Sequence, residues 1–223
     1  MSPEEIASKH PRLFHITRPS AVSSIKEHGL LSTSSLLALF GISGMDRESI
    51  ETRRRPTNIT IHHPSFGEAL ITDNGPLTEA ALAQCLDDGL TPSDWMRLLN
   101  QRVFFWVEQK DVDVHLRASI RHGEHRVVLV FNTLSLVSAY HHRVELAAIN
   151  TGSTMRRPAR RGLSTFSPAK QYTYGEWRHL RGGRDRIKEL TILGGICDVD
   201  AHMTGYYTFP HLDSRSKFDA SFT

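Results

Sequence analysis

Chemically reactive side chains stand on strand-like runs near both ends of this chain. His15 and Thr17 lie in the alternating run 12–17, and Glu189 lies in the run 186–193. An imidazole, a hydroxyl and a carboxylate are costly to bury on apolar strands unless each has a partner or a role. We therefore expect these side chains to line one pocket that binds a sugar and supports cleavage of a bond beside it.

The spacing of His15 and Thr17 places both side chains on one face of their strand, because successive strand residues point to opposite sides. An imidazole beside a hydroxyl can hold the vicinal hydroxyls of a ribose. The plainer interpretation is a buried histidine with a hydrogen-bond partner, next to an ordinary strand threonine.

Glu189 shares its strand face with Ile187 and Thr191. A carboxylate near the C2 hydroxyl of a ribose strengthens that hydrogen bond as positive charge develops at C1, which assists cleavage of the glycosyl bond. The alternative is a solvent-facing glutamate on an edge strand.

A near-continuous apolar run at 102–107 is typical of a central strand and carries three adjacent aromatic residues, Phe104, Phe105 and Trp106. Their side chains alternate in direction, so at least one faces any pocket beside this strand. We expect Phe104 or Phe105 to stack on a flat heterocycle such as nicotinamide. Core packing is the alternative role.

Phosphate groups have several candidate binders. Arg18, Arg102 and the pair at 156–157 could clamp a pyrophosphate, because guanidinium groups match phosphate oxygens. Ser153 belongs to the small polar run 150–154, which could cradle a phosphate but lacks the lysine and spacing of a P-loop. A plain turn is the alternative for this run.

Charge is distributed unevenly along the chain. The formal net charge is +3, yet residues 153–188 contain ten Lys or Arg and two acids, a balance of +8 that leaves about −5 for the rest. This basic segment could bind a nucleic acid, a dinucleotide pyrophosphate or an acidic partner. A solvated basic loop is the alternative.

Composition is that of a globular chain of 223 residues, with 39% hydrophobic and 23% charged residues. The acidic N-terminus is unlike a secretory signal, and the longest apolar run (36–42) is too short to span a membrane. The two cysteines, Cys85 and Cys197, lie far apart in sequence, which fits a reducing compartment better than a disulfide framework. We therefore expect a cytoplasmic location and no membrane contact. The histidine pairs at 62–63 and 141–142 lack zinc-ligand spacing, so no metal is expected.

The predicted elements alternate irregularly, which favours an α+β fold with a largely antiparallel sheet flanked by helices. A single domain is expected over 1–209, followed by a flexible tail at 210–223. Segment 41–56 is predicted as a loop or frayed helix, and 150–170 as a basic loop. Strands are predicted at 12–17, 57–62, 68–72, 102–107, 126–132, 144–149, 186–193 and 205–209. Helices are predicted at 19–28, 34–40, 77–87, 91–99, 112–120, 134–140 and 172–180.

The motifs of this chain resemble those of ADP-ribosyltransferase-fold families, namely DarT-type DNA-modifying toxins and RNA 2′-phosphotransferases. The resemblance rests on a His-x-Thr strand, a helix with a Gly-Leu turn, a central aromatic strand and a late strand glutamate. These are residues 13–17, Ile25 with 29–32, 103–107 and Glu189. Residues 12–202 also resemble an uncharacterised bacterial family with His-x-Thr-Arg-Pro, Arg-Val-Phe-Phe-Trp, Asn-x-Gly-Ser-Thr and Glu-Leu-Thr motifs.

The resemblance implies a split antiparallel sheet with NAD bound between its halves. It implies that His15 holds a ribose, that an aromatic near Phe104 stacks on nicotinamide, and that Glu189 is the catalytic carboxylate. The chain departs from one transferase branch because its central aromatics are never Tyr. Ile187 stands where arginine-modifying toxins carry a second acid, so arginine is not the expected acceptor.

Our hypothesis is therefore an NAD-dependent ADP-ribosyltransferase acting on a nucleic acid or protein, with Glu189 and His15 as catalytic residues. The alternatives are an RNA 2′-phosphotransferase-like enzyme and a non-catalytic nucleic-acid-binding module. A nucleic acid would bind through segment 153–188, and an antitoxin or other protein regulator is a further candidate partner. The NAD contacts expected are His15, Thr17, Arg18, Arg102, Phe104, Phe105 and Ser153.

Overall fold

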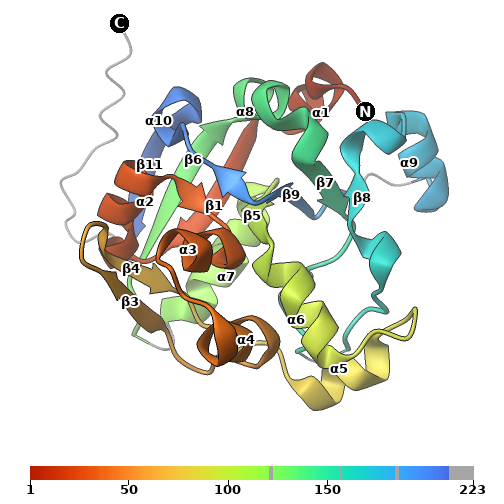
Figure 1. Cartoon of the computed structure of the whole chain (residues 1–223). Coiled ribbons are helices and arrows are strands. Elements are labelled where there is room, and N and C mark those ends of the chain that lie inside the picture. The colour runs from red at the N-terminus through yellow and green to blue at the C-terminus, as the bar shows by residue number, and fades with distance from the viewer. Residues whose placement is uncertain (121–122, 156, 184–185, 211–223) are drawn as a thin grey trace, which may run out of the picture.

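The computed structural model describes residues 1–120, 123–155, 157–183 and 186–210 and has a mixed α+β architecture (Figure 1). A large antiparallel sheet, flanked by helices, confirms the predicted fold class at this level. Its seven strands run in the order β11-β6-β1-β5-β9-β7-β8. They are β1 (Arg12–Thr17), β5 (Arg102–Trp106), β6 (Arg126–Asn132), β7 (Val144–Ala147), β8 (Ser167–Pro168), β9 (Glu189–Leu193) and β11 (Met203–Phe209). The predicted tail lies almost entirely outside the described residues.

The pairing between β1 and β5 divides this sheet into two halves. On one side, β1 pairs with β6 along its whole length, from Arg12 to Thr17. On the other, β5 pairs with β9 along its whole length. Between β1 and β5 the only register pair is Phe14 with Trp106. Beyond Phe14 the two strands separate, and this opening positions the candidate site.

Two small sheets lie outside the main one. The hairpin of β3 (Ile59–His63) and β4 (Gly67–Ile71) lies near α3 and α4 at the lower left of Figure 1. It packs with them through its own apolar cluster, which includes Leu37, Phe40 and Ile61. The second sheet pairs β2 (Leu30–Leu31) with β10 (Gly195–Ile196).

Side chains that cap helix starts explain several helix positions. Ser2 and Glu5 form a reciprocal capping box that begins α1, an element that the hydrophobic pattern did not predict. Thr91 with Asp94 begins α6 in the same way, as predicted. The helices are α1 (Pro3–Lys9), α2 (Val22–His28), α3 (Thr33–Leu39), α4 (Gly44–Thr52), α5 (Glu79–Cys85), α6 (Pro92–Asn100), α7 (Gln109–Ile120), α8 (Thr133–Tyr140), α9 (Tyr174–Leu180) and α10 (Val199–His202).

Element ends differ from the sequence-based expectations in a few places. Segment 41–56, predicted as a loop or frayed helix, contains the helix α4. β7 ends at Ala147 and β9 begins at Glu189, so both strands are shorter than predicted. Within 150–170 the chain forms the short strand β8 and the 3₁₀ helix Leu163–Thr165.

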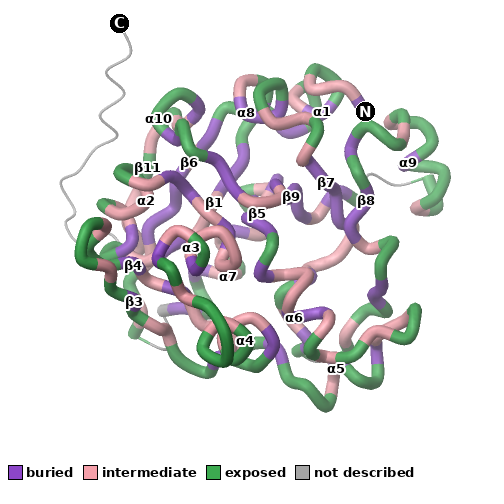
Figure 2. The backbone as a smooth tube through the Cα atoms, viewed as in Figure 1, coloured by how far each residue is buried: buried purple, intermediate pink, exposed green. Residues whose placement is uncertain are grey.

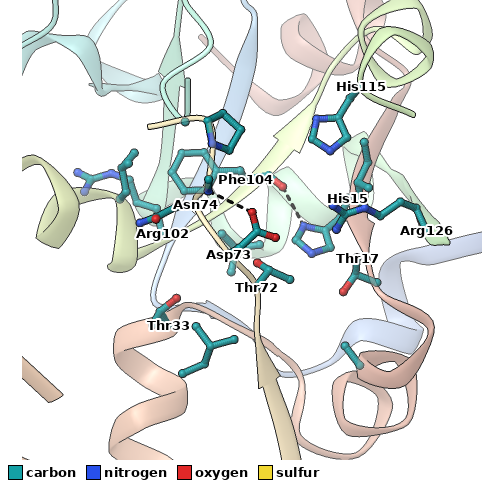
Figure 3. Close-up of a pocket in the computed structure, with 18 of the residues that line it drawn as sticks. His15, Thr17, Thr33, Thr72, Asp73, Asn74, Arg102, Phe104, His115 and Arg126 are labelled. Carbon is teal, nitrogen blue, oxygen red and sulfur yellow. Dashed lines mark hydrogen bonds between the residues drawn. The ribbon is translucent and has the colours of Figure 1, made fainter. Parts of the chain in front are cut away.

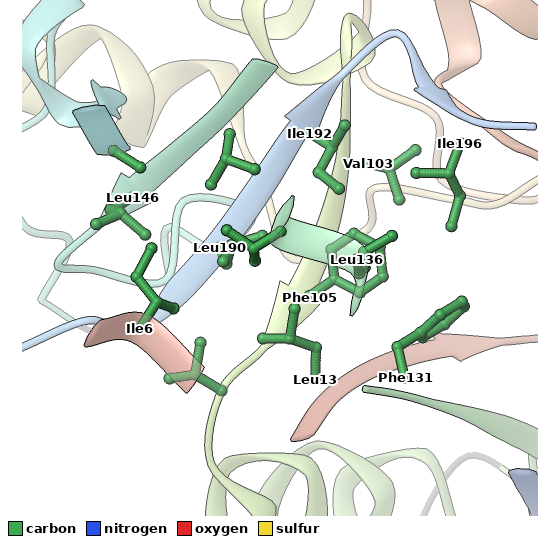
Figure 4. Packing of buried hydrophobic residues seen from close by; sticks show 14 of the residues in the cluster. Ile6, Leu13, Val103, Phe105, Phe131, Leu136, Leu146, Leu190, Ile192 and Ile196 are labelled. Carbon is green, nitrogen blue, oxygen red and sulfur yellow. The ribbon is translucent and has the colours of Figure 1, made fainter. Parts of the chain in front are cut away.

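The main hydrophobic core lies on one face of the sheet (Figures 2 and 4). It contains Leu13, Phe105, Phe131 and Leu190 from four neighbouring strands, covered by helices that include α1 and α8. Fully buried side chains of this size stabilise a fold by about 1.5–3 kcal/mol each. Within the described part of the chain, no helix has the length and apolar character needed to cross a membrane.

Candidate functional site

A cavity of about 1040 Å³ opens where β1 and β5 separate. Its walls include residues 15–17 of β1, which follow the single register pair, and the whole of β5. The loop after β4, the helix α7 and the loop 150–155 supply further walls. Figure 3 shows His15, Asp73, Phe104 and His115 around this space. Its volume is sufficient for a ligand of dinucleotide size.

His15 has a defined proton position. Its Nδ1 lies 2.9 Å from the carbonyl oxygen of Phe104, drawn as a dashed line in Figure 3. A carbonyl can only accept a hydrogen bond, so Nδ1 carries the proton. Burial lowers the pKa of His15, against the opposing effect of this hydrogen bond. At neutral pH the ring is therefore neutral, and Nε2 is a hydrogen-bond acceptor.

Glu189 is the first residue of β9 and lines the same cavity. Its side chain is 4% exposed. Thr151 holds both carboxylate oxygens: its backbone N lies 3.3 and 3.2 Å from them, and its Oγ1 donates at 2.7 Å. Burial raises the pKa of Glu189 to about 7, while the hydrogen bonds from Thr151 and the charges of Lys188 and Arg161 act in the opposite direction. The carboxyl therefore changes its ionisation near physiological pH.

The strand registers show how His15 and Glu189 reach one cavity. Phe14, Trp106 and Glu189 form a row across three strands and share one sheet face, whereas His15 points to the other face of β1. In an unbroken sheet the two groups would be separated by the backbone. Because β1 and β5 separate after Phe14, the gap between them gives both side chains access to the same space.

The loop that holds Glu189 was not identified as such from the sequence. Arg161 is 2% exposed and donates to the carbonyl oxygens of Thr151, Ser153 and Ala159. Trp95 Nε1 also donates to the Thr151 carbonyl, at 3.4 Å. Run 150–154, considered as a phosphate cradle, thus supports the carboxylate. In the sequence, only its small polar residues indicated that this run has a role at the site.

Two of the arginines predicted to clamp a pyrophosphate already pair with carboxylates of the protein. Arg102 lines the cavity but makes two hydrogen bonds to the carboxylate of Glu145, at 2.7 and 3.2 Å. Arg18 is paired with Glu124 at 2.7 Å and with Asp73 at 3.5 Å, and is not among the wall residues. Both guanidinium groups therefore have carboxylate partners in the folded chain.

The remaining predicted contacts divide between wall and core. Thr17, Phe104 and Ser153 line the cavity. Phe105 is also among the wall residues, but its side chain is fully buried and its ring packs in the main core against Phe131. Of the two predicted stacking residues, the half-buried Phe104 is therefore the better placed.

The basic segment 153–188 has fewer cations free to bind a partner than its sequence suggests. Arg161 is buried, Arg160 pairs with Asp87, and Lys188 pairs with Asp111 at 2.5 Å. Residues 156, 184 and 185, which include one member of the predicted arginine pair, lie outside the described residues. Across the described residues, no group of three or more His, Cys, Asp or Glu side chains is arranged to hold a metal ion.

The fold and cavity define an α+β protein with an acid and an imidazole at the opening of a divided sheet. The chain belongs to a family of unknown function, DUF7002, whose model matches residues 11–203. No curated protein and no solved structure matches the chain.

Proposed function

We propose that this chain is an NAD-dependent ADP-ribosyltransferase. The observation that carries the proposal is the pairing of a buried, ionisable carboxylate (Glu189) and a neutral imidazole (His15) on the walls of one cavity of dinucleotide size. The proposal goes beyond family membership and rests on the chemistry of these two groups.

His15 binds and orients in this proposal. Its Nδ1–H is fixed on the Phe104 carbonyl, so Nε2 accepts a hydrogen bond from a ribose hydroxyl. Thr17, which also lines the cavity, can contact a neighbouring hydroxyl. These contacts hold the sugar against the opening between β1 and β5.

Glu189 stabilises charge in this proposal. Its ionised carboxylate accepts a hydrogen bond from the ribose C2 hydroxyl, and this bond strengthens as the bond from C1 to the nicotinamide nitrogen breaks. The electron pair leaves with nicotinamide, which becomes neutral, and the acceptor nucleophile then bonds to C1 and loses its proton. Thr151 and Arg161 keep the carboxylate in place.

The test is nicotinamide release from NAD by the purified chain, compared with Glu189→Gln. Loss of the carboxylate should slow release on the order of 10²–10³-fold, as for other lost transition-state contacts. Glu27→Gln, an exposed change of the same kind, is the matched control. Equal rates in all three proteins would refute the proposal, as would the absence of release from the parent chain.

A further inference from the structure

A second, smaller hollow of about 260 Å³ adjoins the main cavity, and the two share Asp111 and Lys188 as wall residues. Lys110 at the start of α7 and Arg186 before β9 also line it, and both side chains are exposed. The two hollows therefore meet at the ion pair of Asp111 and Lys188, and the larger one also has Glu189 on its wall.

Trp106 contributes an aromatic side chain to the wall of the main cavity. It is the direct partner of Glu189 across β5 and β9, so the two side chains lie side by side on one sheet face. Trp106 is half-buried and lines the main cavity, together with the exposed side chain of Val114. The Nζ of Lys188 lies 5.6 Å from the centre of its ring.

The charge around the smaller hollow favours an anion. Its carboxylates have partners in the protein: Asp111 pairs with Lys188 at 2.5 Å, and Glu108 lies 3.3 Å from His10. Lys110 and Arg186 add two further cations to its walls. An aromatic platform next to cations is the combination by which proteins hold single-stranded nucleic acid, through base stacking and phosphate contacts.

We propose that Trp106 stacks an unpaired nucleobase beside Glu189, while Lys110 and Arg186 bind phosphates of the same strand. The acceptor of the reaction is then single-stranded nucleic acid rather than protein. The role of this site in presenting the acceptor rests on the proposed function, whereas its role in binding nucleic acid does not. It also places the nucleic acid at the two hollows instead of along the whole segment 153–188.

Intrinsic fluorescence reports on this site selectively. The chain has three tryptophans, and Trp95 and Trp177 are both 0% exposed, so Trp106 is the one on a cavity wall. A short single-stranded oligonucleotide, added without NAD, should quench the emission of Trp106. An unchanged emission spectrum at saturating oligonucleotide would overturn the proposal.

Substitutions separate stacking from packing. Trp106→Tyr keeps an aromatic face and should bind a labelled oligonucleotide within a few-fold of the parent chain. Trp106→Leu keeps apolar packing without that face and should lose roughly 5- to 150-fold in affinity, the value of one stacked base. Equal affinity of both variants, with their circular dichroism unchanged, would overturn the stacking role. Effective competition by duplex of the same sequence would overturn the preference for single strands.

The phosphate contacts have their own readout. Lys110→Ala and Arg186→Ala should each reduce the slope of log affinity against log salt by about 0.7. Lys170→Ala removes an exposed cation of the same basic segment that lines neither hollow, and should leave the slope unchanged. An equal loss in all three variants would overturn the site and favour diffuse electrostatic binding.

Nicotinamide release distinguishes the two proposals. Strand binding that depends on Trp106, without NAD cleavage by the parent chain, would leave the site standing and refute the enzyme. Conversely, NAD cleavage with ADP-ribose transfer to protein, and no strand binding, would refute the site and leave the enzyme.

Discussion

The raised pKa of Glu189 predicts a specific dependence of folding stability on pH. The value rises from 4.5 to about 7 because the carboxyl is buried. The folded chain therefore keeps its proton in a range where the unfolded chain has lost it, so this group makes stability fall as pH rises from 4.5 through 7. The full loss, reached above pH 7, corresponds to about 3 kcal/mol.

Substitution Glu189→Gln removes the titration and with it this loss. Between about pH 5 and about pH 8 the free energy of unfolding of the variant should rise relative to that of the parent chain by roughly 2–3 kcal/mol. Any constant cost of altering the contacts with Thr151 cancels in that comparison. The variant would thus lose activity while gaining relative stability at high pH.

Urea denaturation monitored by circular dichroism at several pH values measures this difference directly. Glu27→Gln, whose side chain is 69% exposed, serves as the control and should follow the parent chain at every pH. If the curves for Glu189→Gln and the parent chain run parallel, Glu189 ionises normally in the folded state. Burial would then not raise the pKa of this carboxyl.

Three further predictions concern the contacts around the site. Thr151→Val removes the hydroxyl donor to Glu189, so it should raise the carboxyl pKa further and move the pH profile of nicotinamide release to higher pH; an unchanged profile would show that the hydroxyl does not tune the acid. Arg102→Ala leaves the buried carboxylate of Glu145 without its cation and should lower the free energy of unfolding in urea by about 3–5 kcal/mol. Replacing both Arg102 and Glu145 with leucine should recover much of that loss. Gly29→Ala should destabilise the chain by more than 1 kcal/mol in thermal unfolding, because φ is +92° and the added Cβ would lie 2.5 Å from a carbonyl oxygen of the facing strand; a Tm equal to that of the parent chain would contradict this.

Sequence patterns predicted the elements of the main sheet well where one signal dominated. The predicted run 126–132 is the strand β6, and the predicted run 102–107 contains β5 (Arg102–Trp106), because dense β-branched and aromatic residues leave little ambiguity. The helix α1 was missed because, after its initial proline, Ile6 and Ala7 are its apolar residues, too few to show a helical period, although Ser2 and Glu5 carried a capping signal. Short elements with few buried residues give weak periodicity.

The candidate site was predictable only in part. His15 and Glu189 were identified as unusual residues on strands, and both line the cavity. The partners of Arg18 and Arg102 were not predictable, because Glu124 and Glu145 lie far away in sequence and meet them only in the folded chain. For the same reason Thr151 and Arg161 gave no sign of supporting Glu189.

The sequence by itself determined which residues carry unusual chemistry and that strands and helices mix in an α+β order, since both follow from local composition and periodicity. Tertiary structure alone decided that β1 and β5 share a single register pair and then part. It also decided that an imidazole and a carboxyl from opposite sheet faces reach one cavity. Strand order and register depend on long-range packing, and the pKa of Glu189 depends on how completely that packing excludes water.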